Sequence, residues 1–147
     1  MNLKSIVVAG LAGGSGKSVV SVGLTAALAQ NGERVVTFKK GPDYIDAGWL
    51  QLAAGRRGYN LDPYLMTEEA IVHSFSQHSQ DAEIAIVEGN RGLYDGVNVS
   101  GGYSTAELSV MLNLPILLVV NCTKTTRTVA AMVMGCTHFD PRVDIRG

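Results

Sequence analysis

Gly10-Leu11-Ala12-Gly13-Gly14-Ser15-Gly16-Lys17-Ser18 lies between a short apolar run and a helical segment, and this stretch indicates the fold. Glycines let the backbone curl so that N–H groups converge on phosphate oxygens, and the following helix N-terminus adds partial positive charge. The pattern G-x-x-x-x-G-K-[ST] describes such phosphate loops. Its first glycine stands one position early here, at Gly10, with Leu11 in the usual place. We therefore expect a variant phosphate loop.

The residues of this loop have expected roles in holding a nucleotide. Lys17 reaches the β- and γ-phosphates, and the Ser18 hydroxyl ligates magnesium. These roles imply ATP and Mg²⁺ as the cofactors. The expected nucleotide-binding residues are Gly13, Gly14, Ser15, Gly16, Lys17, Ser18 and Val19.

Four continuous apolar runs rich in Val and Ile indicate strands that are buried on both faces. These runs are Ile6–Ala9, Val35–Phe38, Ile84–Val87 and Ile116–Val120. The expected helices are Ser18–Gln30, Thr67–Gln77, Thr105–Leu112 and Thr125–Met134. Alternating strands and helices predict an α/β fold of the P-loop NTPase type. It is a three-layer sandwich with a mainly parallel sheet and helices on both faces.

Two regions depart from this alternation. Gly41–Asp62 is dense in Gly, Asp, Tyr and Pro, and we expect an irregular segment with a functional role. Val143–Gly147 looks like the approach to another strand. We therefore expect a fragment in which residues 1–147 form one P-loop domain that is incomplete at its C-terminus.

Composition and charge argue against several classes of protein. The formal net charge is −1 and there is no basic stripe, so nucleic acid is not an expected partner. No apolar run approaches the roughly 20 residues of a membrane helix, and no secretory signal is present. Cys122 and Cys136 lack metal or redox spacing, which is typical of reduced thiols in a cytoplasmic protein. His73, His78 and His138 share no metal-binding motif.

Charged residues follow two of the expected strands, at the edge of the sheet where ligands bind in open α/β folds. Glu88 directly follows the strand that ends at Val87. There it would hold the metal or orient a bound water. The alternative is a solvated glutamate at the start of a loop.

A second charged stretch, Lys39–Asp46, follows the strand that ends at Phe38. Asp43 and Asp46 could bind metal or polarise an acceptor, and Lys39 could stabilise charge on a transferring phosphoryl group. Turn formation and helix capping are equally open for these residues. Asp95 is a turn residue unless its loop faces the nucleotide.

Aromatic side chains gather in and around the irregular region, at Tyr44, Trp49, Tyr59 and Tyr64. They either pack that segment or line a pocket for a large flat ligand, and packing is the expected role.

Several stretches resemble the N-terminal ATP-binding domain of cobyrinic acid a,c-diamide synthases. They are Lys39–Asp46, Asn60–Leu65, Glu88–Gly96 and Leu117–Asp140. The phosphate loop with its early glycine is also similar to that family and to its dethiobiotin synthetase relatives. The resemblance covers nearly the whole chain in order.

The resemblance implies an enzyme, a glutamine-dependent amidoligase that uses ATP to amidate side-chain carboxylates of a corrin-type tetrapyrrole in cobalamin biosynthesis. A substrate carboxylate attacks the γ-phosphate, and ammonia displaces phosphate from the resulting acyl phosphate. In the family, that ammonia comes from glutamine, which a C-terminal amidotransferase domain hydrolyses. A homodimer is an open expectation.

The resemblance also assigns roles to individual residues. The catalytic set is Lys17, Lys39, Tyr44, Asp46 and Asp95, and the metal ligands are Ser18, Asp43 and Glu88.

Two features depart from the family pattern. Asn121 stands where an acidic residue is expected, which weakens any polar role for that strand end. No segment resembles the amidotransferase domain, and neither Cys122 nor Cys136 resembles its nucleophile. We therefore expect this chain alone to be inactive with glutamine.

Three alternatives remain open from the sequence. One is a dethiobiotin synthetase-like enzyme, and another is amidation of sirohydrochlorin, with or without nickel. The third is a nucleotide-switch ATPase of the partitioning type. Such switches often carry an extra loop lysine, and Ala12 occupies that position here.

Overall fold

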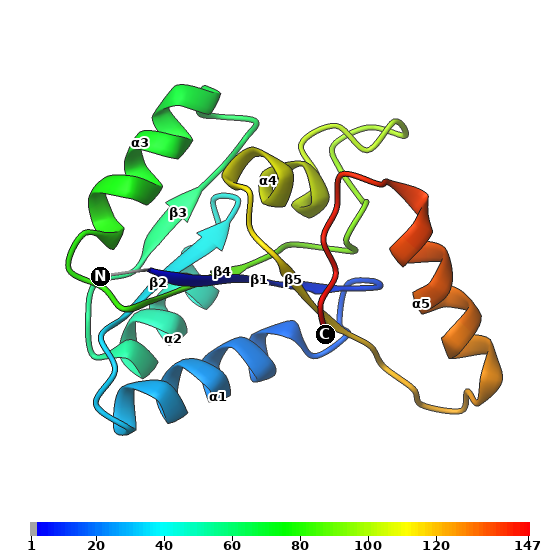
Figure 1. Cartoon of the computed structure of the whole chain (residues 1–147), viewed down its shortest axis with the longest axis horizontal. Helices are drawn as coiled ribbons and strands as arrows, with labels where there is room; N and C mark the ends of the chain where they lie inside the picture. The colour runs from blue at the N-terminus through cyan, green and yellow to red at the C-terminus, as the bar shows by residue number, and fades with distance from the viewer. Residues whose placement is uncertain (1–2) are drawn as a thin grey trace.

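A computed structural model describes residues 3–147 as three layers around one parallel sheet (Figure 1). The sheet has five strands in the order β3-β2-β4-β1-β5, and every neighbouring pair is parallel. The strands are β1 (Lys4–Gly10), β2 (Val35–Lys40), β3 (Tyr59–Leu61), β4 (Ile84–Glu88) and β5 (Ile116–Val119). The predicted α/β class is confirmed.

Helices cover both faces of the sheet, as Figure 1 shows. They are α1 (Lys17–Gln30), α2 (Tyr44–Ala54), α3 (Glu68–Ser79), α4 (Thr105–Leu112) and α5 (Arg127–Phe139). α1 and α2 pack together on one face, whereas α3 and α4 lie on the other. None of the helices in residues 3–147 combines the length and the apolar character that crossing a membrane requires.

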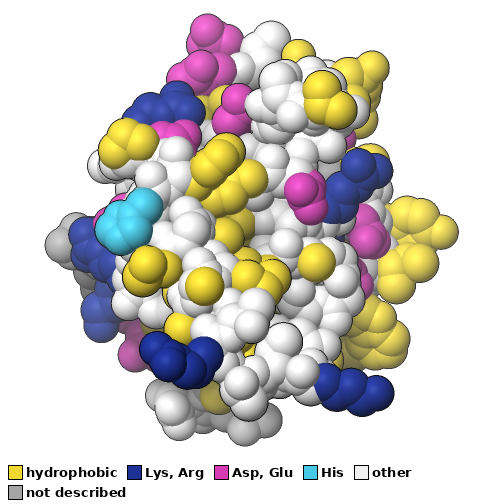
Figure 2. Space-filling view, turned by 90° about the vertical axis from the view of Figure 1, so that its right-hand side faces the viewer, with side chains coloured by type: hydrophobic (Ala, Val, Ile, Leu, Met, Phe, Trp, Pro, Cys, Tyr) yellow, Lys and Arg dark blue, Asp and Glu magenta, His cyan; other side chains and the backbone are white. Residues whose placement is uncertain are grey.

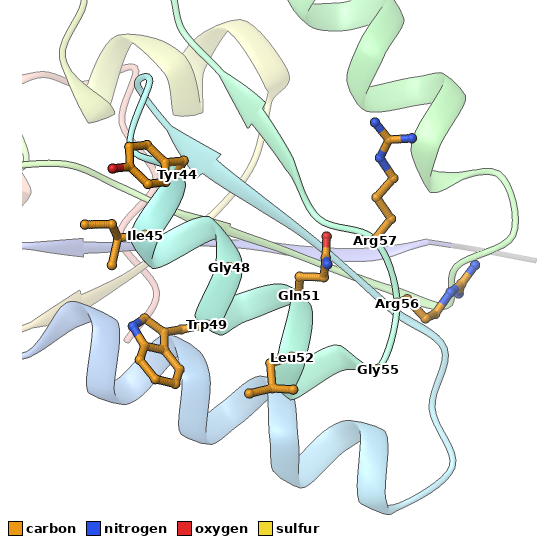
Figure 3. Close-up of a pocket in the computed structure, with 9 residues that line it drawn as sticks. All are labelled: Tyr44, Ile45, Gly48, Trp49, Gln51, Leu52, Gly55, Arg56 and Arg57. Atoms are coloured by element: carbon orange, nitrogen blue, oxygen red, sulfur yellow. The ribbon is translucent and has the colours of Figure 1, made fainter.

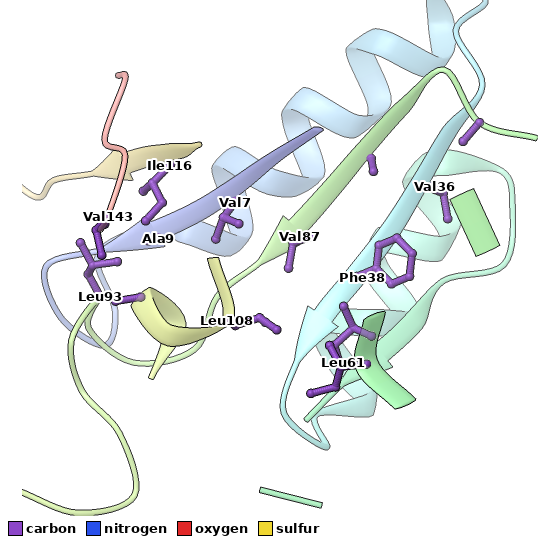
Figure 4. Packing of buried hydrophobic residues seen from close by; sticks show 14 residues of the cluster. Val7, Ala9, Val36, Phe38, Leu61, Val87, Leu93, Leu108, Ile116 and Val143 are labelled. Atoms are coloured by element: carbon purple, nitrogen blue, oxygen red, sulfur yellow. The ribbon is translucent and has the colours of Figure 1, made fainter. Parts of the chain in front are cut away.

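The core explains why the strands read as continuous apolar runs. Successive side chains of a strand point to opposite faces, and both faces of this sheet are covered. On β1, Val7 belongs to the larger cluster with Phe38 and Leu108, on the side of α3 and α4 (Figure 4). The next residue, Val8, packs with Leu24 of α1 on the opposite face. Both faces of β1 are therefore apolar and buried from Val7 to Ala9.

Capping residues set the helix ends much as the sequence predicts. Thr67 Oγ1 accepts a hydrogen bond from Ala70 N, which fixes the start of α3. Asn31 ends α1, and Gly32 follows it with a φ of 88°. The end of α5 differs from expectation, because the helix runs on to Phe139 instead of ending at Met134.

The expectation of an irregular segment over Gly41–Asp62 is wrong, because this region contains α2 and β3. Asp43 begins the helix, since its Oδ1 accepts hydrogen bonds from Ile45 N at 2.9 Å and Asp46 N at 3.1 Å. Gly55, with a φ of 63°, ends it. Asp43 and Asp46 thus lie at the start of a helix and not in an irregular segment.

The last residues pair with β5, as the expectation of a further strand implies. Ile145 forms a parallel bridge with Ile116. Arg146 N donates to Ile116 O at 3.0 Å, and Leu118 N donates to Gly147 O at 2.8 Å. The segment therefore lies in strand geometry beside β5.

Candidate functional site

The phosphate loop between β1 and α1 wraps around its own lysine. Lys17 Nζ donates to Ala12 O at 3.1 Å, and Ser15 Oγ donates to the same carbonyl at 2.7 Å. A Cβ added at Gly10 would lie 3.1 Å from both Lys17 Cγ and Ser15 Cβ. The loop therefore folds over position 10, which explains why the glycine stands there and Leu11 occupies the usual glycine position.

The N-terminus of α1 offers donors for an anion. Gly16 precedes the helix with a φ of 94°, and no side chain caps the first turn. These backbone N–H groups, together with the helix dipole, favour phosphate at this end. Burial, and next the charge of Lys39, lower the pKa of Lys17, so a phosphate beside its ammonium group would offset that cost.

The rest of the loop is open to solvent. Nothing lies within 4 Å of a Cβ added at Gly13 or Gly14, and Val19 projects from α1 with 79% of its surface exposed. The loop therefore leaves space on its outer side for the bulk of a nucleotide.

Four side chains, from α1, β2, α2 and β4, meet beside the loop, and we call them the carboxylate cluster: Ser18, Lys39, Asp46 and Glu88. Ser18 Oγ donates to Glu88 Oε1 at 2.7 Å and lies 3.3 Å from Asp46 Oδ2. Lys39 Nζ donates to Asp46 Oδ2 at 2.8 Å and to Glu88 Oε1 at 2.9 Å. A third bond from Lys39 Nζ reaches Gly89 O at 3.2 Å. The ammonium group of Lys39 thus has three acceptors.

Hydrogen bonds within the cluster favour the charged forms of Lys39 and Asp46. Burial by itself would lower the pKa of Lys39, but its hydrogen bonds to Asp46 and Glu88 raise that pKa overall. The hydrogen bond from Lys39 is also the main reason why the pKa of Asp46 is lowered. Lys39 and Asp46 therefore stay ionised across the neutral range.

One oxygen of the cluster has no partner. Glu88 is fully buried, and its Oε2 makes no hydrogen bond with the described residues. A buried carboxylate oxygen without a partner is costly unless a cation or a donor fills the place. The Ser18 hydroxyl beside it is the other oxygen that a phosphate-loop magnesium ion takes. Ser18 and Glu88 therefore fit magnesium.

Asp43 and Tyr44 stand apart from the cluster. The hydrogen bonds described above for Asp43 are those of a helix cap, and it is Asp46 that contacts Ser18 and Lys39. Tyr44 is 80% exposed. Metal binding by Asp43 and catalysis by Tyr44 therefore stay predictions.

Asp95 lies in the loop that follows β4, and this loop packs against the phosphate loop. Leu93 N donates to Gly10 O at 2.7 Å. Asp95 Oδ2 accepts from Gly92 N at 3.1 Å, and its charge acts on the pKa of Lys17. Asp95 is thus both a turn residue and a neighbour of the nucleotide lysine.

The aromatic residues divide into two groups. Tyr59 stacks on His78 with ring centroids 3.6 Å apart, so the expectation of packing holds for it. Tyr44 and Trp49 project outward from α2 beside a groove of about 970 Å³ (Figure 3). Tyr64 is exposed as well. Packing alone therefore does not account for these three.

Two residues that sequence reasoning did not single out support the site. Asn60 Nδ2 donates to Gly41 O at 2.8 Å and to Asp43 O at 3.0 Å, which fixes the turn before α2. Lys40 is buried beside the cluster. The sequence pointed to Lys40 and Asn60 only because they lie within Lys39–Asp46 and Asn60–Leu65, two stretches that resemble the diamide synthases.

Asn121, at the expected acidic position, is exposed, and its Oδ1 accepts from Thr123 N at 2.9 Å in a local turn.

Figure 2 views the molecule from the side of α5. Both signs of charge are mixed there with separate hydrophobic groups.

A phosphate loop between a parallel strand and a helix, with hydroxyl, lysine and carboxylate groups at the adjoining strand ends, defines a P-loop nucleotide-binding domain. Solved structures agree on the fold. The signal recognition particle receptor FtsY from Elizabethkingia anophelis aligns with a TM-score of 0.67 at 18% identity, over 97% of this chain and 48% of that one. FtsY from Thermotoga maritima aligns with a TM-score of 0.61 at 16% identity, over 99% and 51%.

Residues 6–146 match the family described as the CobQ/CobB/MinD/ParA nucleotide binding domain, and the chain belongs to that family. It is 44% identical over its full length to a cobyrinate a,c-diamide synthase from Dehalococcoides mccartyi strain CBDB1, of which it covers 32%. It is 50% identical over 85% of its length to the synthase of that name from Magnetococcus marinus, of which it covers 27%.

A hydrogenobyrinate a,c-diamide synthase from Streptomyces coelicolor is 45% identical over 97% of the chain, which covers 29% of it. The chain thus spans about a third of the length of these curated relatives. These similarities confirm the resemblance that the sequence motifs carry.

Proposed function

We propose that the chain is the ATP-dependent part of an enzyme that amidates side-chain carboxylates of a corrin-type tetrapyrrole. The observation that carries this proposal is the carboxylate cluster, set directly beside the phosphate loop. In this cluster the Ser18 hydroxyl donates to Glu88 Oε1, and Glu88 Oε2 has no hydrogen-bond partner among the described residues, which supports a metal-binding role for this carboxylate. Relatives named as a,c-diamide synthases of cobyrinate and hydrogenobyrinate support the choice of substrate.

The residues that would hold ATP are those of the phosphate loop and the start of α1. Backbone N–H groups from Gly13 to Val19 surround the phosphates, and Lys17 reaches the β- and γ-phosphates. Ser18 and Glu88 hold magnesium, with Asp43 or Asp46 as a further carboxylate on the same side. Bound magnesium supplies charge neutralisation on the phosphates.

The chemistry that follows joins a carboxylate to ammonia. A carboxylate oxygen of the tetrapyrrole attacks the γ-phosphorus, the bond to the β–γ bridging oxygen breaks, and ADP leaves. Ammonia then attacks the acyl carbon, inorganic phosphate leaves with its oxygen, and one proton is lost to give the amide. Carboxylates are weak nucleophiles, so positioning and charge stabilisation by Lys17 and Lys39 must provide most of the acceleration.

We further propose that glutamine is the origin of the ammonia and that a separate amidotransferase unit hydrolyses it in the cytoplasm. Neither Cys122 nor Cys136 of this chain has the surroundings of such a nucleophile. Cys122 is exposed, and burial raises the pKa of the Cys136 thiol. Turnover by the chain itself is therefore expected with ammonium but not with glutamine.

The test is a turnover assay with Mg-ATP and ammonium, on the protein expressed with any sequence that follows residue 147 in its gene. The candidate substrates are cobyrinic acid, sirohydrochlorin with and without nickel, and diaminononanoate with bicarbonate. Mass spectrometry identifies the products. Lys17→Ala should abolish turnover, whereas Lys4→Ala, at an exposed lysine at the amino end of β1, should not.

A macrocycle that gains amide groups supports the proposal and identifies the substrate. Dethiobiotin formation would move the chain to the ring-closing relatives. ATP hydrolysis with no product from any candidate would leave only the nucleotide site and favour a nucleotide switch.

A further inference from the structure

A second pocket lies next to the carboxylate cluster, between the end of β2 and the loop that follows β4. Its volume is about 340 Å³, and both signs of charge and two aromatic rings line it. The residues that matter are Lys40, Asp62, Tyr64, Asp95, Arg91 and Tyr103. We call it the cation pocket after its two basic side chains, Lys40 and Arg91.

Lys40 is the central observation. The residue is 8% exposed, and its ammonium group forms no hydrogen bond and no ion pair with any of residues 3–147 that the structure describes. The group is not among the fully enclosed polar atoms without a partner, so it opens onto the pocket. Burial lowers the pKa of this lysine, and Asp62 opposes that effect from a distance. A lysine whose stem is buried and whose ammonium group opens onto a pocket without a protein acceptor is free to bind an anionic ligand there.

The two acidic residues of the pocket are already engaged with backbone donors. Asp62 Oδ1 accepts from Tyr64 N at 2.9 Å, and Asp95 Oδ2 accepts from Gly92 N at 3.1 Å. Neither forms an ion pair with Lys40 within the described residues. Asp62 therefore acts on Lys40 through its charge at a distance, and no carboxylate of the described residues directly contacts the ammonium group.

Arg91 faces the same pocket in an unusual backbone conformation. Its φ is 55°, and among the residues that the structure describes its side chain makes a single hydrogen bond, a long one of 3.4 Å from the guanidinium group to Gly96 O. Tyr103, with a φ of 64°, lines the pocket too. Residues other than glycine in the left-handed region carry strain that concentrates at binding sites.

We propose that Lys40 and Arg91 anchor a second, non-reacting carboxylate of the substrate while another carboxylate meets the phosphate loop. This inference rests on the proposed function, because it assumes a substrate with several carboxylates. It assigns a specificity role to two residues that have no place in the phosphoryl transfer itself.

The walls of the cation pocket fit a flat macrocycle. Tyr64 and Tyr103 meet edge to face, with ring centroids 5.6 Å apart at 85°. Tyr64 is 63% exposed and the neighbouring Leu65 is 67% exposed, so an apolar surface borders the two cations. Peripheral carboxylates on an apolar ring match this combination of charge and apolar wall.

The position relative to the nucleotide also fits. The loop that carries Arg91 packs on the phosphate loop through the bond from Leu93 N to Gly10 O. Asp95, which lines the cation pocket, is close enough for its charge to act on Lys17. A macrocycle anchored at Lys40 would therefore keep its other carboxylates beside the γ-phosphate site.

The experiment compares binding of cobyrinic acid with binding of its fully methyl-esterified form, by isothermal titration calorimetry on the same protein as above. Lys40→Met and Arg91→Gln should each weaken binding of the acid about 10- to 100-fold, the loss expected for a charge-assisted hydrogen bond. Binding of the ester and of ATP should stay unchanged. Lys40→Arg should retain binding, and Lys4→Met controls for the loss of one positive charge.

Turnover separates an anchoring role from damage to the fold. Lys40→Met should raise KM for the tetrapyrrole and leave KM for ATP unchanged. Equal affinity of wild type and Lys40→Met for the acid overturns this inference, while amide formation by both keeps the proposed function. If the acid binds in a Lys40-dependent way without turnover, the inference stands and the amidation proposal fails. If wild type does not bind the acid at all, both fall.

Discussion

Lys39 and Glu88 are direct register partners on β2 and β4, and Lys39 Nζ lies 2.9 Å from Glu88 Oε1. The side chain of Lys39 is 3% exposed and that of Glu88 is not exposed at all. The pair therefore couples the middle of the sheet to the phosphate loop, because Ser18 donates to the same carboxylate oxygen.

Replacing one partner of the Lys39–Glu88 pair should strongly lower the stability of the folded protein. Lys39→Met leaves the buried carboxylate of Glu88 without its cation, and Glu88→Gln leaves the buried ammonium group of Lys39 with Asp46 as its remaining anion. Each is expected to lower the free energy of unfolding by about 3–5 kcal/mol. The double variant should lose clearly less than the sum, because neither buried charge of the Lys39–Glu88 pair remains. Urea unfolding of the four proteins measures this coupling.

The exposed pair between Arg34 and Glu83 is the matched control, with an N–O distance of 3.3 Å. Glu83→Gln should cost no more than about 1 kcal/mol. Additive losses at Lys39 and Glu88 would contradict the coupling.

Glu88→Gln should also separate magnesium binding from nucleotide binding. The change keeps the shape of the side chain and removes the charge that would face the metal. We expect the affinity for Mg-ATP to fall about tenfold or more, whereas affinity for ATP in the presence of EDTA should change little. Calorimetric titrations with and without magnesium give both values. Glu33→Gln, at the amino end of β2, should leave both affinities at their wild-type values.

Asp43 allows capping and metal binding to be told apart. Asp43→Ala removes the cap of α2 and should destabilise the protein by about 1 kcal/mol, whereas Asp43→Asn keeps a capping oxygen and should be nearly neutral. If Asp43 also ligates magnesium, the Asn variant will lose Mg-ATP affinity despite normal stability. Thermal unfolding and magnesium titration of the two variants therefore give different patterns for the two roles.

The pH dependence of stability should identify Asp46. Its pKa is lowered from 3.8 in the folded protein, chiefly by the hydrogen bond from Lys39. Its contribution is therefore present above that ordinary value and is lost as the pH falls through the lowered folded pKa. Lys39 has a raised pKa, so its contribution persists below 10.5 and is lost only as the pH rises through the raised value.

Unfolding free energies of wild type and Asp46→Asn, measured across the acid range, test this. The difference between the two proteins should be constant near neutral pH and should shrink below about pH 4. A difference that is independent of pH would mean that the charge of Asp46 contributes nothing.

The sequence predicted most of the sheet because strands that are buried on both faces are continuous apolar runs. Such runs are easily recognised at Val35–Phe38 and Ile84–Val87. The same reasoning missed α2 because the helix does not show an apolar stripe toward the core. Its large apolar residues Ile45 and Trp49 are exposed, and its fully buried side chain is Leu50. β3 is three residues long, Tyr59–Leu61, which is too short for periodicity to reveal.

The site was predictable as far as strand ends allow. Glu88 and Lys39 each end or nearly end a strand, so their meeting at one edge follows from parallel pairing. The sequence could not show that Asp46, and not Asp43, contacts Ser18 and Lys39. That difference arises because Asp43 caps α2, which places Asp46 in the first turn of the helix. The place of Lys40 could not be derived from the sequence either, because Lys39 and Lys40 are both buried and the sequence does not show which of them has acceptors.

The strand order β3-β2-β4-β1-β5 limits the order in which the sheet can form during translation. β1 and β2 are consecutive in the chain but are not neighbours, because β4 lies between them. Neither can complete its hydrogen-bonded pairing until Ile84–Glu88 has left the ribosome. The phosphate loop is synthesised early but gains its carboxylate partner late. A nascent chain stalled before residue 84 should therefore expose both strands to chaperones and have no working nucleotide site.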